Sequence, residues 1–289
     1  MNEDTKRQAF DAMDFSGGAA VIEKTLALEG AMALEKTLAL TVAYNGAGFR
    51  GFARQQGQAT VQGELERALQ TIFHHEVETV GAGRTDAGVH ALGQVVSFKL
   101  PIGEYETQTP DKLRNSLNAL TPDGIVVRKI EEKPEDFSAR FSAVEREYRY
   151  RFVFEEVEPL FIRPYVWWAP QSHPVDVQAM KQAAEHLLGE HDFASFCTAD
   201  SSIGKNTVRE VLSLTFFGTD HLGESCLVLQ IRGNAFLHSM VRVIAGSLLE
   251  VGTRKREPSW IAEVLSARDR KAAGQTAPAQ GLTLWRVRY

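Results

Sequence analysis

Residues 81–90 read Gly-Ala-Gly-Arg-Thr-Asp-Ala-Gly-Val-His, and this decamer is the most informative part of the chain. Its three glycines allow tight turns and a close approach of the backbone to a ligand, where a Cβ would intrude. Arg84 and Asp86 stand two positions apart, so in an extended segment both side chains leave on one face. A neighbouring guanidinium favours the charged form of a carboxylate. A charged Asp on a loop is suited to covalent catalysis, which the decamer therefore predicts.

Two other interpretations remain open on the composition of the decamer alone. Glycine-rich loops with an aspartate are common as turns, and an Arg-Asp pair is often a structural ion pair. The loop could also hold a phosphate. Against this, the string lacks the third glycine of the dinucleotide fingerprint and has no Gly-Lys-Ser/Thr.

Further stretches, taken with the decamer, resemble one family. They are GRTDAGVH at 83–90 followed by GQVV at 93–96, DFSARFSA at 136–143 with YRY at 148–150, NAFLHSMVR at 234–242, and APAQGL at 277–282. In this order and at this spacing the chain resembles the TruA family of tRNA pseudouridine synthases, from about Leu38 to Tyr289. The resemblance makes catalysis the favoured interpretation of the decamer.

The hydrophobic pattern of the first half predicts the order β-α-β-β-α-β, which is the ferredoxin-like unit. Strands are expected at 38–44, 76–81, 93–100 and 125–130. Thr60 is suited to cap the first helix. The apolar residues of the two helices are expected to face the sheet: Val61, Leu65, Ala68, Leu69 and Ile72 in the first, and Leu113, Leu117 and Leu120 in the second.

The second half repeats this organisation with additions. Tyr148, Tyr150, Phe152 and Phe154 alternate, so in a strand their rings share one face. Further elements are expected as helices at 176–188 and 237–251, a short helix from 258, and strands at 207–217, 225–233 and 282–289. The expected class is α+β, with two ferredoxin-like domains whose antiparallel sheets join across a central cleft, as the resemblance also implies.

The expected boundaries are 37–136 for the first domain, which carries the Asp loop, and 137–289 for the second. Residues 1–36 are interpreted as an N-terminal extension without an assigned function. The string EKTLAL at 23–28 recurs at 35–40, and only the second copy leads into the motifs.

Composition excludes several classes of protein. The chain has 289 residues, a net charge of −5 and two cysteines, Cys197 and Cys226, without zinc-ligand spacing. We expect free buried thiols, no metal, a cytoplasmic location and no membrane span, because no run of eighteen apolar residues occurs. The acidic balance counts mildly against a nucleic-acid partner, but residues 1–36 hold −3 of it. Basic residues cluster in the remainder, at 140–151 and at 254–256.

The resemblance assigns roles to particular residues. It makes Asp86 the catalytic carboxylate and gives Arg84 two tasks, keeping Asp86 ionised and filling the gap left by an extruded base. Tyr148 would lie against the uracil, although its aromatic alternation alone favours a core position. Arg140 is expected near a phosphate or Asp86, with Phe137 and Phe141 bordering the cleft. Candidates for contacts with the RNA backbone are Arg54, Lys205, Arg209 and Arg242; His238 and Met240 are expected to pack.

The function implied by the resemblance is isomerisation of uridine to pseudouridine at positions thirty-eight to forty of the tRNA anticodon stem-loop. It uses base flipping and no cofactor, in a homodimer. Three alternatives remain: a related synthase with another RNA target, an inert RNA-binding module, and a nucleotide-binding enzyme. The first is kept open by Ala53, which stands where the resemblance implies Gln; Phe52 stands where it implies Trp and can replace Trp as an apolar residue.

Overall fold

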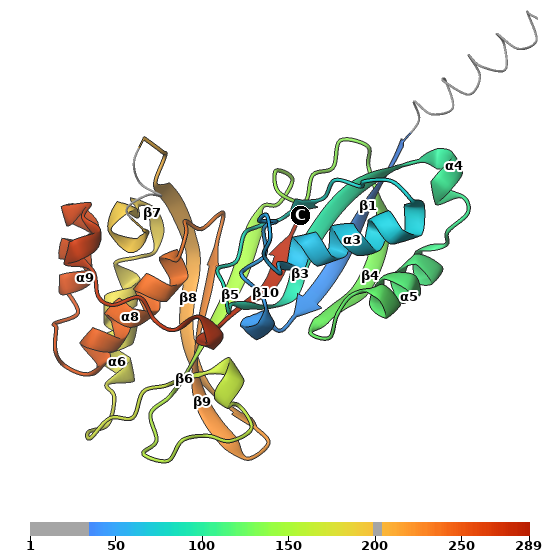
Figure 1. The fold of residues 1–289 in the computed structure, drawn as a ribbon. Coiled ribbons are helices and arrows are strands. Elements are labelled where there is room, and N and C mark those ends of the chain that lie inside the picture. The colour runs from blue at the N-terminus through green and yellow to red at the C-terminus, as the bar shows by residue number, and fades with distance from the viewer. Residues whose placement is uncertain (1–34, 199–203) are drawn as a thin grey trace, which may run out of the picture.

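Ten strands form one sheet in the computed structural model, which describes residues 35–198 and 204–289. The strands are β1 (Glu35–Tyr44), β2 (Val80–Gly81), β3 (His90–Pro101), β4 (Ile125–Lys133), β5 (Glu145–Val153), β6 (Trp167–Trp168), β7 (Gly189–Asp192), β8 (Val208–His221), β9 (Glu224–Gly233) and β10 (Leu282–Arg288). The helices are α3 (Val61–Phe73), α4 (Ile102–Tyr105), α5 (Pro110–Leu120), α6 (Val177–Glu185), α8 (Met240–Gly252) and α9 (Trp260–Ala267). Figure 1 shows the strands running through the molecule, with helices gathered into two separate groups.

The strand order is β4-β1-β3-β10-β5-β9-β8-β7, with β2 paired to β3 and β6 to β5. Pairing within each half is antiparallel except for the short parallel pair of β5 with β6. The two halves meet through a second parallel pair, β10 with β3, in which Thr283 lies opposite His90 and Leu284 opposite Ala91. The sheet as a whole is therefore mixed. The last strand of the chain lies between strands of the two halves (Figure 1).

Both groups of helices cover the same face of this sheet. Leu284 of β10 lies opposite Ala91 on one side and Tyr148 on the other, so these three side chains share a face. All three belong to one large apolar core, to which α3 and α5 contribute in the first half and α6, α8 and α9 in the second. A space between the two groups of helices thus lies above the middle of the sheet.

Most of the expected elements are present, with shifted ends. Thr60 caps α3, and its hydroxyl accepts a hydrogen bond from the amide of Gly63. The strand expected from Leu38 already begins at Glu35. Leu120 was expected in the core but is 37% exposed, because α5 ends at this residue. The first copy of the repeated string lies outside the described residues.

Three short elements were not expected, namely α4, β6 and β7. Their sequences, IGEY, WW and GEHD, are too short to carry a periodic signal. Both cysteines are buried and free. None of the helices in the described ranges is long and apolar enough to cross a membrane.

Candidate active site

A cavity of about 880 Å³ opens above the middle of the sheet, between the two groups of helices. Its lining comes from both halves of the chain: the loop after the short 3-10 helix η1 (Gly46–Gly48), the decamer, β5, the start of β8 and the segment that leads into α8. Among the described residues, six arginines line it and Asp86 is the only carboxylate. The arginines are Arg50, Arg54, Arg84, Arg140, Arg146 and Arg209. The electrostatics of the cavity therefore favour a polyanion.

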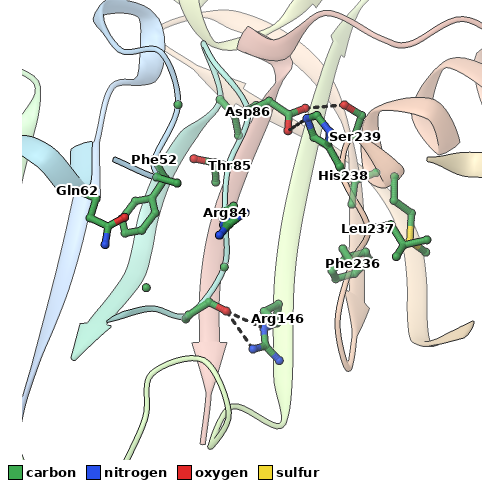
Figure 2. A pocket seen from close by; sticks show the side chains of 18 of the residues that line it. Phe52, Gln62, Arg84, Thr85, Asp86, Arg146, Phe236, Leu237, His238 and Ser239 are labelled. Atoms are coloured by element: carbon green, nitrogen blue, oxygen red, sulfur yellow. Dashed lines mark hydrogen bonds and ion pairs between the residues drawn. The ribbon is translucent and has the colours of Figure 1, made fainter. Parts of the chain in front are cut away.

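The Asp86 side chain is held by three residues at the beginning of α8. Arg242 Nη1 lies 2.7 Å from Asp86 Oδ2, and the Ser239 hydroxyl donates to the same oxygen at 2.8 Å. His238 Nε2 lies 3.1 Å from the other oxygen, Oδ1 (Figure 2). The carboxylate also lies at the N-terminal end of a helix, where the dipole favours negative charge. Its side chain is 15% exposed, so it remains accessible from the cavity.

Ser239 is in an unfavourable backbone conformation. Its φ is 60° and its ψ is 5°, in the left-handed region that residues with a Cβ rarely adopt. Such a conformation costs on the order of 1 kcal/mol or more and persists only where surrounding contacts hold it. At Ser239 the compensating contact is the hydrogen bond to Asp86.

The expected partnership between Arg84 and Asp86 is wrong. Arg84 is exposed and forms no ion pair with Asp86 in the described structure. Figure 2 shows Asp86 reaching toward Ser239 and His238, with Arg84 outside this group. Between them, Thr85 points into the core, and its hydroxyl lies 2.8 Å from that of Tyr44. The guanidinium of Arg84 is therefore available to a ligand in the cavity.

Arg242 also differs from its expectation as a phosphate contact. Its side chain is only 18% exposed, and its Nε donates to the carbonyl of Ala277 at 2.8 Å. The amide of Ala277 donates back to the carbonyl of Arg242 at 3.1 Å. The APAQGL stretch thus fixes the arginine that pairs with Asp86, which gives this stretch a place in the site.

Tyr148 lines the cavity while being 7% exposed. Its ring meets Phe236 edge-on, with centroids 5.2 Å apart. Burial raises the pKa of the Tyr148 hydroxyl above its ordinary value, and the negative charge of Asp86 raises it further. The hydroxyl therefore stays protonated near neutral pH and can donate a hydrogen bond. The core and substrate-facing interpretations both hold, because the ring is packed and its hydroxyl lies at the cavity.

The arginines and aromatic residues of the segment before β5 are used in different ways. Arg140 lines the cavity, but Phe137 and Phe141 do not. Phe137 packs on the ring of Tyr289 at 4.8 Å, and Phe141 is 80% exposed, with the Arg140 guanidinium 5.3 Å from its ring. The two phenylalanines thus flank the cavity wall without reaching the cavity.

Arg146 fixes the walls of the cavity to one another. Its guanidinium donates to the carbonyls of Ala82, Arg140, Ala143 and Asn234 at distances from 2.6 to 3.3 Å. These carbonyls belong to the decamer, to the segment before β5 and to the segment before α8. Because its donors are already used by the protein, Arg146 holds the site together.

The other expected RNA contacts are not equivalent. Arg54 lines the cavity, 63% exposed, with Nη1 3.2 Å from Glu66 Oε2. Arg209 also lines it and donates to the carbonyls of Asn206 and Val208, and burial lowers its pKa. Lys205 is exposed and lies outside the cavity lining. No group of three or more His, Cys, Asp or Glu residues suited to a metal ion occurs in the described ranges.

His238 was expected to pack, but it is a cavity residue with a side chain 57% exposed. Met240 does pack, with no exposed surface. Residue spacing gave no signal for His238, because it precedes α8 and is separated from the helix by Ser239 in the left-handed region, so helical periodicity does not relate it to Arg242.

Comparison with known proteins identifies the family. The family model described as tRNA pseudouridine synthase matches residues 40–142 and 183–289. The tRNA pseudouridine synthase A of Brevibacillus brevis is 45% identical over 249 residues, which are 86% of this chain and 97% of that protein. The protein of the same name from Thermotoga neapolitana is 39% identical over 251 residues, 87% of this chain and 98% of that one. An arginine-lined cavity around one paired carboxylate defines a site for nucleic-acid chemistry. The chain belongs to the tRNA pseudouridine synthase family.

Proposed function

We propose that this protein isomerises uridine to pseudouridine in tRNA, with Asp86 as the catalytic carboxylate. The observation that carries the proposal is the position of Asp86, which is the only carboxylate among the described residues of a cavity lined by six arginines. The arginines suit the phosphates of an RNA chain. The carboxylate suits a reaction at the single nucleoside that enters between them.

The reaction moves one bond and one proton. The bond between N1 of the uracil and C1′ of the ribose breaks, the uracil turns, and a bond forms between its C5 and the same C1′. The proton on C5 is lost and N1 gains one, so no oxidant or cofactor is needed. Asp86 is the group that would attack the sugar or base or remove a sugar proton, and Tyr148 would lie against the uracil.

A stacked uridine must leave the RNA helix to reach Asp86, at a cost of a few kcal/mol. Arg84 is placed to fill the gap, since it is exposed at the cavity and has no ion pair with Asp86. Arg54, Arg140 and Arg209, which also line the cavity, would hold phosphates around the extruded base. The proposed targets are the uridines at positions thirty-eight to forty of the anticodon stem-loop.

Tritium release from C5-labelled uridine in unmodified tRNA tests the proposal, followed by mapping of the modified positions. Wild-type protein should release tritium from the anticodon arm. The Asp86→Asn variant keeps the size of the side chain but loses its charge, so release should fall to background while tRNA binding survives. Near-normal turnover by this variant would exclude Asp86 as the catalytic group.

The mapping also tests a related synthase with another RNA target. Ala53 lines the cavity. The family resemblance implies an amide side chain at this position, and alanine lacks that hydrogen-bonding group. Release of tritium from uridines outside the anticodon arm would support this alternative. Binding of tRNA without release would favour an inert RNA-binding module.

We further propose that the two halves, 37–136 and 137–289, are ferredoxin-like domains and that the protein acts in the cytoplasm as a homodimer. The strand orders support the first point: β4-β1-β3-β2 and β10-β5-β9-β8 arrange four strands in the same way. The sheet face opposite α6 and α8 supports the dimer, because it presents aromatic surface that a second copy could cover. On this face Phe217 is 37% exposed, and the Arg149 guanidinium lies 3.7 Å from the centre of the Trp285 ring. Sedimentation equilibrium measures the assembly directly.

A further inference from the structure

The two oxygens of Asp86 are held unequally. Oδ2 accepts hydrogen bonds from two partly buried donors, Arg242 in the first turn of α8 and Ser239, the residue that precedes the helix. Oδ1 is contacted by one side chain, His238, which is 57% exposed. Oδ2 is therefore committed to the protein, and Oδ1 is the oxygen a substrate can reach once the imidazole leaves.

The imidazole of His238 lies across the approach to Oδ1. Its Nε2 is 3.1 Å from Oδ1, and its Nδ1 is 3.2 Å from the hydroxyl of Thr198. Both ring nitrogens are thus engaged, one with the carboxylate and one with the segment that follows η3 (Ala194–Phe196). The exposed edge of the ring faces the cavity (Figure 2).

We propose that His238 is a displaceable cap, a positioning residue that occupies Asp86 Oδ1 in the free enzyme and must leave it when a nucleoside enters. The inference rests on the proposed function of Asp86 and adds to it a competition between substrate and imidazole for one oxygen. Arg242 and Ser239 keep the carboxylate in place during the exchange, because they bind the other oxygen.

Among the described residues that line the cavity, Asp86 is the only carboxylate beside the ring. The contact between the ring and Oδ1 must therefore break before a nucleoside can take that oxygen.

Two variants of His238 separate the cap from a structural role. In His238→Ala no side chain competes for Oδ1, so KM for tRNA should be lower than that of the wild type by up to about fivefold, the scale of an exposed ion pair, with kcat nearly unchanged. In His238→Gln a neutral donor replaces the ring and can still occupy Oδ1, so KM should stay closer to the wild-type value.

The measurements are KM and kcat by tritium release, with thermal unfolding to show that each variant folds. His186→Ala is the matched control, since His186 is an exposed histidine at the end of α6, outside the cavity lining. Its KM and kcat should equal those of the wild type. A KM for His238→Ala equal to or above the wild-type value, or a kcat loss above tenfold, would overturn the cap. Absence of tritium release by the wild type would instead refute the proposed function.

Discussion

Gly81 and Gly83 are two positions apart in the decamer, yet the reasons for their lack of a side chain differ. A Cβ on Gly81 would lie 2.3 Å from the ring of Phe52, inside the protein's own packing. A Cβ on Gly83 would meet only the hydroxyl of Tyr148, at 3.8 Å. The protein tolerates a methyl group at the second position, but the cavity loses space beside Tyr148.

This difference gives a prediction at the scale of single residues. Gly81→Ala should destabilise the fold by about 1–3 kcal/mol, the usual cost of overpacking. Gly83→Ala should leave the unfolding temperature nearly unchanged but lower kcat/KM by about tenfold or more, because the reacting base is displaced. Thermal denaturation and tritium release measure the two effects. Equal losses of stability in both variants would show that Gly83 is a packing glycine as well.

The sequence placed Asp86 in the cavity but gave it the wrong partner. Arg84 was the natural choice because it stands only two positions from Asp86, whereas Arg242 lies 156 positions away. A pairing across that distance depends on how α8 packs against the decamer, which residue spacing does not encode. The stretch around Arg242 was recognised from its resemblance, yet its roles were read as packing and phosphate contact.

At the scale of elements, the long periodic segments were predictable and the short ones were not. The helix capped by Thr60 and the alternating aromatic residues of β5 carry clear periodic signals, and both are present. β2 has only two residues, and β6 and β7 also lack a pattern of their own. Such short pairs form because a neighbouring strand offers free hydrogen-bonding groups, a tertiary effect that local sequence does not record.

The cap of α3 supports a prediction at this scale. Thr60 is 1% exposed, and its hydroxyl accepts a hydrogen bond from the amide of Gly63. Thr60→Ala leaves this amide without a partner and should lower the free energy of unfolding by about 1 kcal/mol. Thr60→Ser keeps the acceptor and serves as the control in chemical denaturation. A Ser variant as unstable as the Ala variant would assign the loss to packing of the methyl group.

Glu147 on β5 links three strands of the second half. Its side chain is 1% exposed and pairs with Arg149 and with Arg286 of β10, while Gln230 of β9 donates to it at 2.6 Å. Burial acts to raise the pKa of this carboxyl, but the hydrogen bonds from Gln230 and Arg149 and the charge of Arg149 lower it overall. The charged form is thus preferred in the folded protein.

A prediction about pH follows from this direction. Because the folded pKa of Glu147 lies below the unfolded value, its stabilisation is complete above the ordinary range of a glutamate and is lost as pH falls through the folded pKa. Glu147→Gln should cost about 2 kcal/mol at pH 7 and much less near pH 3. Urea denaturation at both pH values measures the difference. If the two proteins differ in free energy of unfolding by the same amount at both pH values, the loss comes from packing and not from the charge of Glu147.

At the scale of the whole molecule, the net charge of the chain is negative, whereas the charge around the cavity is positive. The chain carries −5, yet the cavity is lined by six arginines, of which Arg50, Arg54, Arg84 and Arg140 are exposed. Each arginine that binds a phosphate releases a counterion, so four contacts predict a slope of about −3 for log K against log salt. Equilibrium binding of tRNA between 50 and 200 mM salt, where all four would contribute, gives this slope. A slope near zero would show that these arginines do not bind the phosphates of tRNA.

The place of β10 in the sheet has a consequence for synthesis of the protein. Strands β3 and β5 do not pair with each other; the carboxy-terminal strand lies between them and contributes Leu282 to the cavity lining. A growing chain can begin to fold its amino-terminal half on the ribosome. It still lacks β10, the strand through which the two halves of the sheet are joined. Translation must therefore pass β10 before the enzyme can work, and a chain that stops short of this strand would be inactive.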